Sequence, residues 1–318
     1  MKVSSLVQYG TMHMRKRYSV LIAALLTLAL CVSCMTALAE SAADGAAVSD
    51  AKKGDWRNIL LLGADAGGPD GGEPTDVMII LSVNATQKKA KMTSILRDTR
   101  VSYPGISGQG KINAANIYGG PELAVATVND CFDADIRNYV LVDMAGLIRA
   151  VDQIGGVDVA VSAAEQKLVN AYVQDFLGDF GAYSGETAIK ESGDSVHLNG
   201  LLTMAYCRAT TGTDDSELTQ RRRNVLRAGL VKIKACGAVE LAGLISSVLE
   251  DVKTDMSLMD LVSLADVGLG IDVDSIERFH LPADGTYESV MTGGVLSIKP
   301  DFDANKARLH DFLYGPGL

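Results

Sequence analysis

The chain has 318 residues, 47% of them apolar, which is enough to bury one large hydrophobic core or two smaller ones. Its formal net charge is −10, and this acidic balance argues against a nucleic-acid-binding protein, whose affinity depends on Lys and Arg. We therefore expect no nucleic-acid partner, and any site for an anionic ligand must be a local basic cluster.

The first 55 residues have the pattern of a targeting region. Residues 1–17 form a basic tail, no acid precedes Glu40, and residues 18–39 are 22 residues without a charge. A helix of that length spans about 33 Å, enough for the core of a bilayer. The charge distribution predicts a single-pass anchor in the cell membrane with a cytoplasmic N-terminus. Residues 40–55 are small and polar, as in a flexible linker.

Two alternatives to a retained anchor remain open. Ala37-Leu38-Ala39 has the small-x-small form of a signal-peptide cleavage site, and cleavage after Ala39 would release a secreted protein. Cys34 suggests a lipoprotein site, although Cys31 before it fits that pattern poorly. All three interpretations place residues 56–318 outside the cytoplasmic membrane as the extracytoplasmic domain.

Apolar runs alternate with helical patterns through the first half of this domain. The runs typical of buried strands are residues 57–62, 77–83, 91–96, 138–142 and 157–161. Helical patterns cover residues 111–118, 122–130 and 144–154, with Gly119-Gly120 as a break and residues 105–110 as a loop. This rhythm predicts an α/β fold with a mixed central sheet covered by helices on both faces.

The second half has a mainly helical pattern. Helices are expected at residues 165–176, 198–208, 217–235, 238–249 and 302–313, and a further helix is expected to begin near residue 254. Strands are expected at residues 276–281 and 295–299, and a loop at residues 178–193.

The strand at residues 91–96 ends abruptly in the ionic pair Arg97-Asp98. Ligand sites of α/β sheets lie outside the carboxyl ends of strands, and a guanidinium binds phosphate oxygens in a bidentate manner. A phosphate site is one interpretation, and a local ion pair that closes a strand is the other.

Two carboxylates flank neighbouring apolar runs. Asp65 follows the first strand and Asp76 precedes the second. If the two strands are neighbours, both oxygen ligands reach one rim of the sheet, which suits Mg²⁺. The alternative is a pair of solvated loop acids.

Four arginines on the later helices are candidate phosphate ligands. Arg208 ends one helix, and Arg221, Arg222 and Arg223 begin another. Consecutive helical residues point about 100° apart, so the three cannot all face one site. A solvated basic face is the alternative, and we accept it for Arg222. Serine-hydrolase and phosphate-loop motifs are absent from the chain.

These residues occur within segments that resemble the LytR-CpsA-Psr proteins of Gram-positive cell envelopes. The matching segments are Asn58-Ile-Leu-Leu-Leu-Gly-Ala-Asp65, Thr75-Asp76, Ile95-Leu-Arg97-Asp98-Thr99, Lys111-Ile-Asn-Ala-Ala with Tyr118-Gly-Gly120, Val151-Asp-Gln-Ile-Gly-Gly-Val-Asp158, His197-Leu-Asn-Gly200 with Ala205-Tyr-Cys-Arg208, and Arg221-Arg-Arg-Asn-Val-Leu226. They follow the family order over roughly residues 57–235.

The resemblance implies a phosphotransferase that moves an anionic glycopolymer, such as teichoic acid or capsule, from a polyprenyl-pyrophosphate carrier to peptidoglycan. It also implies Mg²⁺ (or Mn²⁺) as the cofactor and an apolar tunnel for the lipid. The residues carried over as metal ligands are Asp65 and Asp76, those for the pyrophosphate are Arg97, Lys111, Arg208, Arg221 and Arg223, and the catalytic set is Arg97, Asp98 and Asp76. Asp98 or Asp76 would accept the proton of the acceptor hydroxyl.

The chain departs from the family pattern where further arginines are usual. Gly67, Pro74, Thr210 and Leu218 occupy such positions or their neighbours. The alternative function is therefore a catalytically weakened paralogue that binds polyprenyl-phosphate lipid or glycan without transfer and has a regulatory role in the envelope. A DNA-binding regulator is disfavoured, because the domain is acidic and has no basic recognition helix.

Overall fold

The computed structural model describes residues 56–64, 74–180, 183–209, 251–257, 275–292 and 295–315, with further positions between 220 and 272. The predicted tail, anchor and linker lie outside these residues. Within the described part of the chain, no helix is long and apolar enough to cross a bilayer. The described residues divide into a helical unit, Met144–Asp251, and a sheet unit, which comprises the residues before Met144 together with Val252–Leu318.

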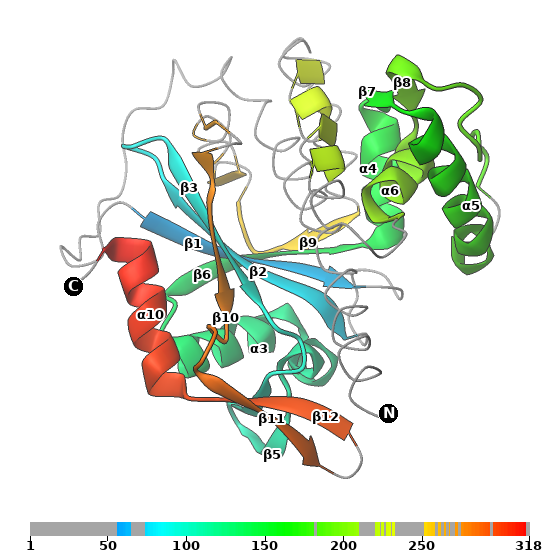
Figure 1. The fold of residues 1–318 in the computed structure, drawn as a ribbon. Coiled ribbons are helices and arrows are strands. Elements are labelled where there is room, and N and C mark those ends of the chain that lie inside the picture. Colours follow the sequence, from blue (N-terminus) through cyan, green and yellow to red (C-terminus); the bar gives the residue numbers. More distant parts are fainter. Residues whose placement is uncertain are drawn as a thin grey trace. The chain divides into compact units, whose positions relative to one another are not determined.

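The sheet unit is built on six strands in the order β10-β3-β2-β1-β6-β9 (Figure 1). They are β1 (Trp56–Ala64), β2 (Thr75–Asn84), β3 (Lys89–Ile95), β6 (Ile136–Asp143), β9 (Val252–Thr254) and β10 (Glu277–Leu281). Strand β1 pairs antiparallel with β2 and parallel with β6, so the sheet is mixed, as predicted. Both edge strands come from the C-terminal part of the chain, and Val252 at the start of β9 pairs with Val142 of β6.

Two helices, α3 (Ala115–Phe132) and α10 (Phe302–Tyr314), pack on one face of this sheet. The side chains of Leu60 and Leu62 point into the core that these helices share with β1. The intervening side chains of β1, Ile59 and Leu61, are also buried. The predicted helical cover is confirmed for one face, and the cover of the other face stays a prediction.

Two β-hairpins complete the sheet unit. They are β4 (Arg100–Tyr103) with β5 (Ile106–Lys111), and β11 (Tyr287–Thr292) with β12 (Val295–Pro300). The predicted loop at residues 105–110 is wrong, because the polar segment after Gly105 pairs with β4 despite its low strand propensity. The 3-10 turn Ile112–Ala114 then leads into α3, which is kinked at the predicted Gly119-Gly120 break.

The helical unit contains α4 (Met144–Gln153), α5 (Ala163–Phe180) and α6 (Gly200–Arg208), with the antiparallel pair β7 (Val157–Val161) and β8 (Gly193–Leu198). Strand β8 was not predicted. A Cβ atom on Gly200 would collide with the carbonyl oxygen of Ile148, so α4 and α6 approach to backbone contact there. The helices predicted at residues 217–235 and 238–249 lie largely or wholly outside the described residues.

Candidate active site

A β-bulge places Asp76 at the rim of the sheet. Gly63 of β1 pairs with Val77, whereas Ala64 pairs with Thr75, so Asp76 has no partner in the register. Bulges redirect side chains and are frequent next to active sites. The prediction that the first two strands are neighbours in the sheet is therefore confirmed. Asp65, which follows Ala64 in sequence, lies outside the described residues.

The turn that carries Arg97 follows β3 at the same rim. The backbone N–H and the side-chain hydroxyl of Thr99 both donate to the carbonyl of Leu96, at 3.0 and 2.5 Å. The carbonyl of Asp98 accepts a hydrogen bond of 2.9 Å from the backbone N–H of Ile298 in β12. The turn is thus held both by its own residues and by a strand 200 positions later.

Four side chains of this rim form a charged cluster: Asp76, Arg97, Asp98 and Lys111. Arg97 forms an ion pair with Asp76 through Nη1, and its Nε lies 3.8 Å from Asp98 Oδ2. Lys111 Nζ lies 2.6 Å from Asp98 Oδ1. The Arg97 and Asp76 side chains are only 15% and 17% exposed. The structure therefore brings together two cations and two carboxylates that the sequence placed in one site.

The β4–β5 hairpin positions Lys111. The Tyr103 hydroxyl donates to the Lys111 carbonyl at 2.6 Å, and burial, with a smaller effect of Tyr118, raises the pKa of Tyr103 to about 12. A Cβ atom on Gly110 would collide with the Tyr103 hydroxyl, so only glycine leaves room for this contact. Sequence reasoning missed this role of Tyr103, although the tyrosine follows Arg97 by six residues.

Asp143 is a further carboxylate at this rim that the sequence analysis did not single out. It ends β6, pairs with Ala64 in the register and is 8% exposed. The sequence contains a signal for Asp143, because an acid directly after the apolar run of residues 138–142 repeats the arrangement of Asp65. Asp143 also directly precedes α4, where an N-terminal capping role explains an aspartate equally well.

The remaining predicted arginines belong to the helical unit. Arg208 ends α6 and is partly buried, and Arg223 lies outside the described residues. Arg221 is 4% exposed and donates to the carbonyls of Tyr206 and Ala209, at 3.0 and 2.7 Å.

The expectation for Arg222 is wrong. It is 5% exposed rather than solvated, and its Nε donates to the Cys207 carbonyl at 3.0 Å. The end of α6 provides carbonyl acceptors, which explains why neighbouring arginines on the next helical segment are both buried.

A cavity of about 620 Å³ lies within the helical unit. Its lining includes Glu165 and Tyr206, together with Arg221, whose Nε is buried without a hydrogen bond and lies 3.6 Å from Glu165 Oε1. The described part of its lining has one cation, Arg221, against the two carboxylates Glu165 and Asp194, whereas the charged cluster has two cations against two carboxylates, so the cavity is less suitable for a phosphate.

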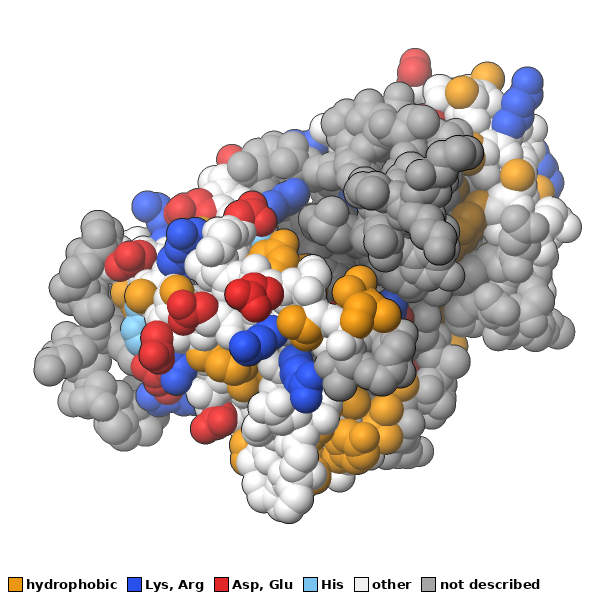
Figure 2. All heavy atoms as spheres, turned by 60° about the horizontal axis from the view of Figure 1, so that its bottom comes forward, with side chains coloured by type: hydrophobic (Ala, Val, Ile, Leu, Met, Phe, Trp, Pro, Cys, Tyr) orange, Lys and Arg blue, Asp and Glu red, His pale blue; other side chains and the backbone are white. Residues whose placement is uncertain are grey.

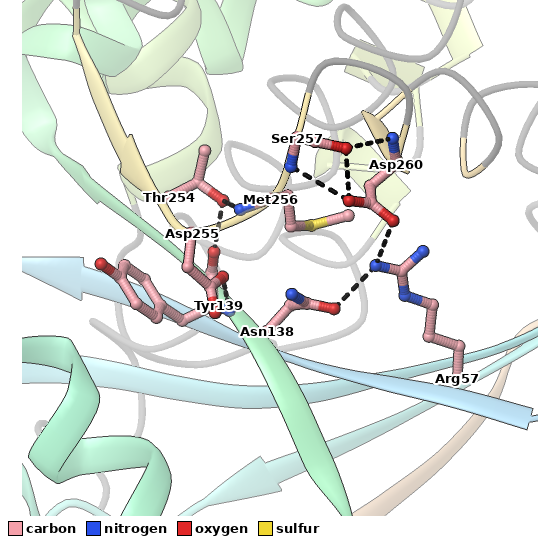
Figure 3. Close-up of polar contacts among 8 residues, drawn as sticks. All are labelled: Arg57, Asn138, Tyr139, Thr254, Asp255, Met256, Ser257 and Asp260. Carbon is pink, nitrogen blue, oxygen red and sulfur yellow. Dashed lines mark hydrogen bonds and ion pairs between the residues drawn. The ribbon is translucent and has the colours of Figure 1, made fainter. Parts of the chain in front are cut away.

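A second polar cluster, shown in Figure 3, fastens the segment after β9 to the sheet. Arg57 Nη2 donates to Asn138 at 2.7 Å and to Asp260 at 2.9 Å. Asp260 accepts hydrogen bonds from the Ser257 hydroxyl and backbone N–H, and the Ser257 hydroxyl, followed by Arg57, lowers the pKa of the Asp260 carboxyl. Because these groups satisfy one another, the cluster has a structural role.

Whether the rim of the sheet can bind a metal ion depends on the donor atoms that its side chains supply. Among the described residues, no group of three His, Cys, Asp or Glu side chains could hold a metal ion. Mg²⁺ commonly takes only one or two carboxylates and completes its shell with water and substrate phosphates. Asp76, a carboxylate at the rim beside Arg97, fits such a sparse site.

A model of the LytR_cpsA_psr family matches residues 31–308. The chain belongs to this family. A Polyisoprenyl-teichoic acid--peptidoglycan teichoic acid transferase TagU of Oceanobacillus iheyensis is 32% identical over 222 residues. That alignment covers 67% of this chain but only 63% of the relative, so the chain spans less than two thirds of its length.

Solved structures confirm the family fold. B. subtilis TagV is 24% identical with a TM-score of 0.58, over 82% of this chain and 96% of its own. TagT bound to LI-WTA is 25% identical with a TM-score of 0.57, over 85% of this chain and 95% of its own. The mixed α/β architecture of this LytR_cpsA_psr protein is thus that of known relatives.

Proposed function

We propose that this protein transfers an anionic glycopolymer of the teichoic-acid type from a polyprenyl-pyrophosphate carrier to peptidoglycan. The observation that carries the proposal is the charged cluster at the sheet rim, in which Arg97 lies between Asp76 and Asp98. The similarity to the teichoic acid transferase TagU and to TagT bound to LI-WTA supports the reaction and the polymer class. The protein would act as a single-pass membrane protein with its domain outside the cytoplasmic membrane.

Phosphoryl transfer depends on positioning and charge neutralisation more than on covalent help from the protein. Arg97 is suited to this task because its turn is fixed by backbone hydrogen bonds to β12 and within the turn. A diphosphate would compete with Asp76 for the guanidinium. Replacement of Asp76 by the diphosphate would bind the donor to Arg97 and release the Asp76 carboxylate beside it.

Lys111 contributes charge and also orients Asp98, which it contacts at 2.6 Å. Asp98 or the released Asp76 accepts the proton of the acceptor hydroxyl, and the pH profiles of Asp98→Asn and Asp76→Asn variants distinguish them.

We further propose that Asp76, with Asp65, holds Mg²⁺. A divalent cation bound there would neutralise charge on the phosphate oxygens. The position of Asp76 at the rim, beside Arg97, supports this assignment. Removal of the ion by a chelator should abolish transfer and leave the protein folded.

The assignment of Arg208 and Arg223 as pyrophosphate ligands stays a prediction from the family resemblance. For Arg221, the two carbonyl partners and the 4% exposure favour a structural role over direct binding in the described state. An Arg221→Ala variant should therefore lose stability as well as activity.

A second candidate function is a family member that binds the lipid or glycan without transferring it. The observation in its favour is the replacement of usual arginines at Gly67, Thr210 and Leu218. Each charged hydrogen bond contributes about 1.5–3 kcal/mol, so three losses would weaken a pyrophosphate site considerably.

One experiment separates the two functions. The full chain in lipid vesicles is mixed with a lipid-linked teichoic-acid precursor, peptidoglycan and Mg²⁺, and phosphodiester-linked product is measured. Product formation that is lost in Arg97→Ala supports transfer. A lipid that co-purifies without any turnover supports the binding function, and turnover unchanged in Arg97→Ala refutes the assigned site.

A further inference from the structure

Large apolar side chains are exposed on one part of the sheet unit. Of the described residues, the exposed large apolar side chains of this unit are Ile106, Ile117, Tyr118, Met291 and Leu296. They come from the turn of the β4–β5 hairpin, the first turn of α3 and the end of the β11–β12 hairpin. We call these five residues the apolar surface. Single exposed apolar residues are normal, but a concentration on adjoining segments marks an interaction site.

The three segments adjoin one another and the charged cluster. Tyr118 of α3 packs against Tyr103 of β4, with ring centroids 5.2 Å apart. Ile298 of β12 forms a parallel bridge with Thr99 and donates its N–H to the carbonyl of Asp98. The apolar surface therefore borders the turn that carries Arg97.

The exposed side chains of the β11–β12 hairpin are directed alike. Met291 and Leu296 are paired in the antiparallel register, so both project from one face of the hairpin. Met291 is 63% exposed and Leu296 is 44% exposed. Figure 2 looks onto the side of the sheet unit that carries the two hairpins and shows apolar side chains beside Lys, Arg, Asp and Glu side chains.

We propose that the apolar surface rests on the outer face of the lipid bilayer and directs the charged cluster towards membrane-embedded substrate. Unbranched and branched aliphatic side chains with one tyrosine are the composition of a shallow interfacial contact, in which the tyrosine occupies the headgroup level. A soluble protein partner bound to the apolar surface would not explain why the charged cluster lies next to that surface. A bilayer that contains the lipid-linked substrate would explain it.

The length of chain before β1 allows the apolar surface to reach the bilayer. Residues 40–55 join the predicted membrane segment to Trp56, and 16 fully extended residues reach about 55 Å at most. The average separation for a flexible linker is about 20–25 Å. Trp56 starts β1 at the rim opposite to the charged cluster, about 30 Å away along the strand, a distance that the extended linker still spans. Weak apolar contacts then suffice to decide which rim of the tethered sheet unit meets the bilayer.

The proposal rests on the predicted anchor and on the proposed function, and photo-crosslinking tests it independently of turnover. The full chain is placed in phospholipid nanodiscs with benzoylphenylalanine at Met291, at Leu296 or, as the control, at Arg137. The Arg137 side chain is 67% exposed and lies at the start of β6, at the opposite rim from the charged cluster.

We expect lipid adducts at Met291 and Leu296 at least five-fold above those at Arg137. Equal yields at the three positions, or adducts chiefly to a second copy of the chain, would overturn the proposal. Because no catalysis is needed, these outcomes are independent of whether the protein is a transferase.

Substitutions in the apolar surface then test whether membrane docking affects the transfer rate. The Met291→Asp/Leu296→Asp variant should transfer from a membrane-embedded donor at least five-fold more slowly, yet use a short-chain, water-soluble donor at the unaltered rate. Met291→Leu should retain both activities. Equal loss with both donors in a folded Met291→Asp/Leu296→Asp variant would contradict membrane docking, whereas absence of turnover in the unsubstituted chain would instead contradict the proposed function.

Discussion

Replacement of Arg97 separates its part in the fold from its proposed part in catalysis. Arg97→Ala leaves Asp76 without its ion-pair partner in a site where both side chains are less than one-fifth exposed. Loss of one partner costs about 3–5 kcal/mol for a buried pair and about 0.2–1 kcal/mol for an exposed one. Asp98 keeps Lys111, so we expect a loss between these limits, about 2–3 kcal/mol.

The conservative variant isolates the catalytic part. Arg97→Lys keeps the positive charge near Asp76 but loses the bidentate donor geometry. One lost charged hydrogen bond of about 1.5–3 kcal/mol corresponds to a rate decrease of about 10- to 150-fold. The protein should therefore remain nearly as stable as the unsubstituted chain while its transfer rate falls by that factor.

Urea denaturation of the single variants Arg97→Ala and Asp76→Ala and of the double variant provides the assay, with the initial rate of polymer transfer measured in parallel. A coupling free energy above about 1 kcal/mol is expected for contacting residues. Arg137→Ala, which removes an exposed pair with Asp135, is the matched control and should change stability by less than about 1 kcal/mol. Additive effects within about 0.5 kcal/mol, or full activity of Arg97→Lys, would refute the reasoning.

Three further predictions concern the support of the fold. Gly110→Ala should lower the free energy of unfolding by about 1–3 kcal/mol, because the added methyl group collides with the Tyr103 hydroxyl. Gly193→Ala is the control: there is room for a methyl group at this position, so the thermal midpoint should change little. Arg222→Ala should cost about 1.5–3 kcal/mol in chemical denaturation, because a backbone carbonyl loses its charged donor, whereas a solvated arginine would give less than about 0.5 kcal/mol. Asp260→Ala should cost about 0.5–2 kcal/mol at pH 7. Since the pKa of Asp260 is lowered on folding, its ionic contribution is present above the ordinary value of 3.8 and lost as the pH falls below it, so an equal penalty at pH 7 and pH 2.5 would contradict this assignment.

The parts of the site that follow strand ends could be predicted from the sequence. The abrupt change from apolar to charged residues located Arg97-Asp98, and the short separation of two apolar runs located Asp76 beside β1. Lys111 was reached only through the family resemblance, because its position depends on the β4–β5 hairpin. That hairpin contains a polar, glycine-containing strand whose pairing is set by tertiary contact rather than by propensity.

Burial of charged residues was harder to predict. Helical periodicity separates the directions of Arg221 and Arg222, but it does not reveal that the carbonyls at the end of α6 accept hydrogen bonds from both. The hydrogen bond from Ile298 of β12 to Asp98 of the Arg97 turn joins residues 200 positions apart and has no local signal. Such long-range contacts are fixed only when the whole sheet unit is assembled.

The pairing of Val142 with Val252 holds together the two points of the chain between which the helical unit lies. The helical unit leaves and re-enters the sheet unit at adjacent positions of two antiparallel strands, β6 and β9. In sequence order the helical unit lies between two paired strands, whose ends the sheet unit holds together. Changes of length within residues 144–251 should therefore leave the register of β6 and β9, and the position of Arg97 in the sheet unit, unaltered.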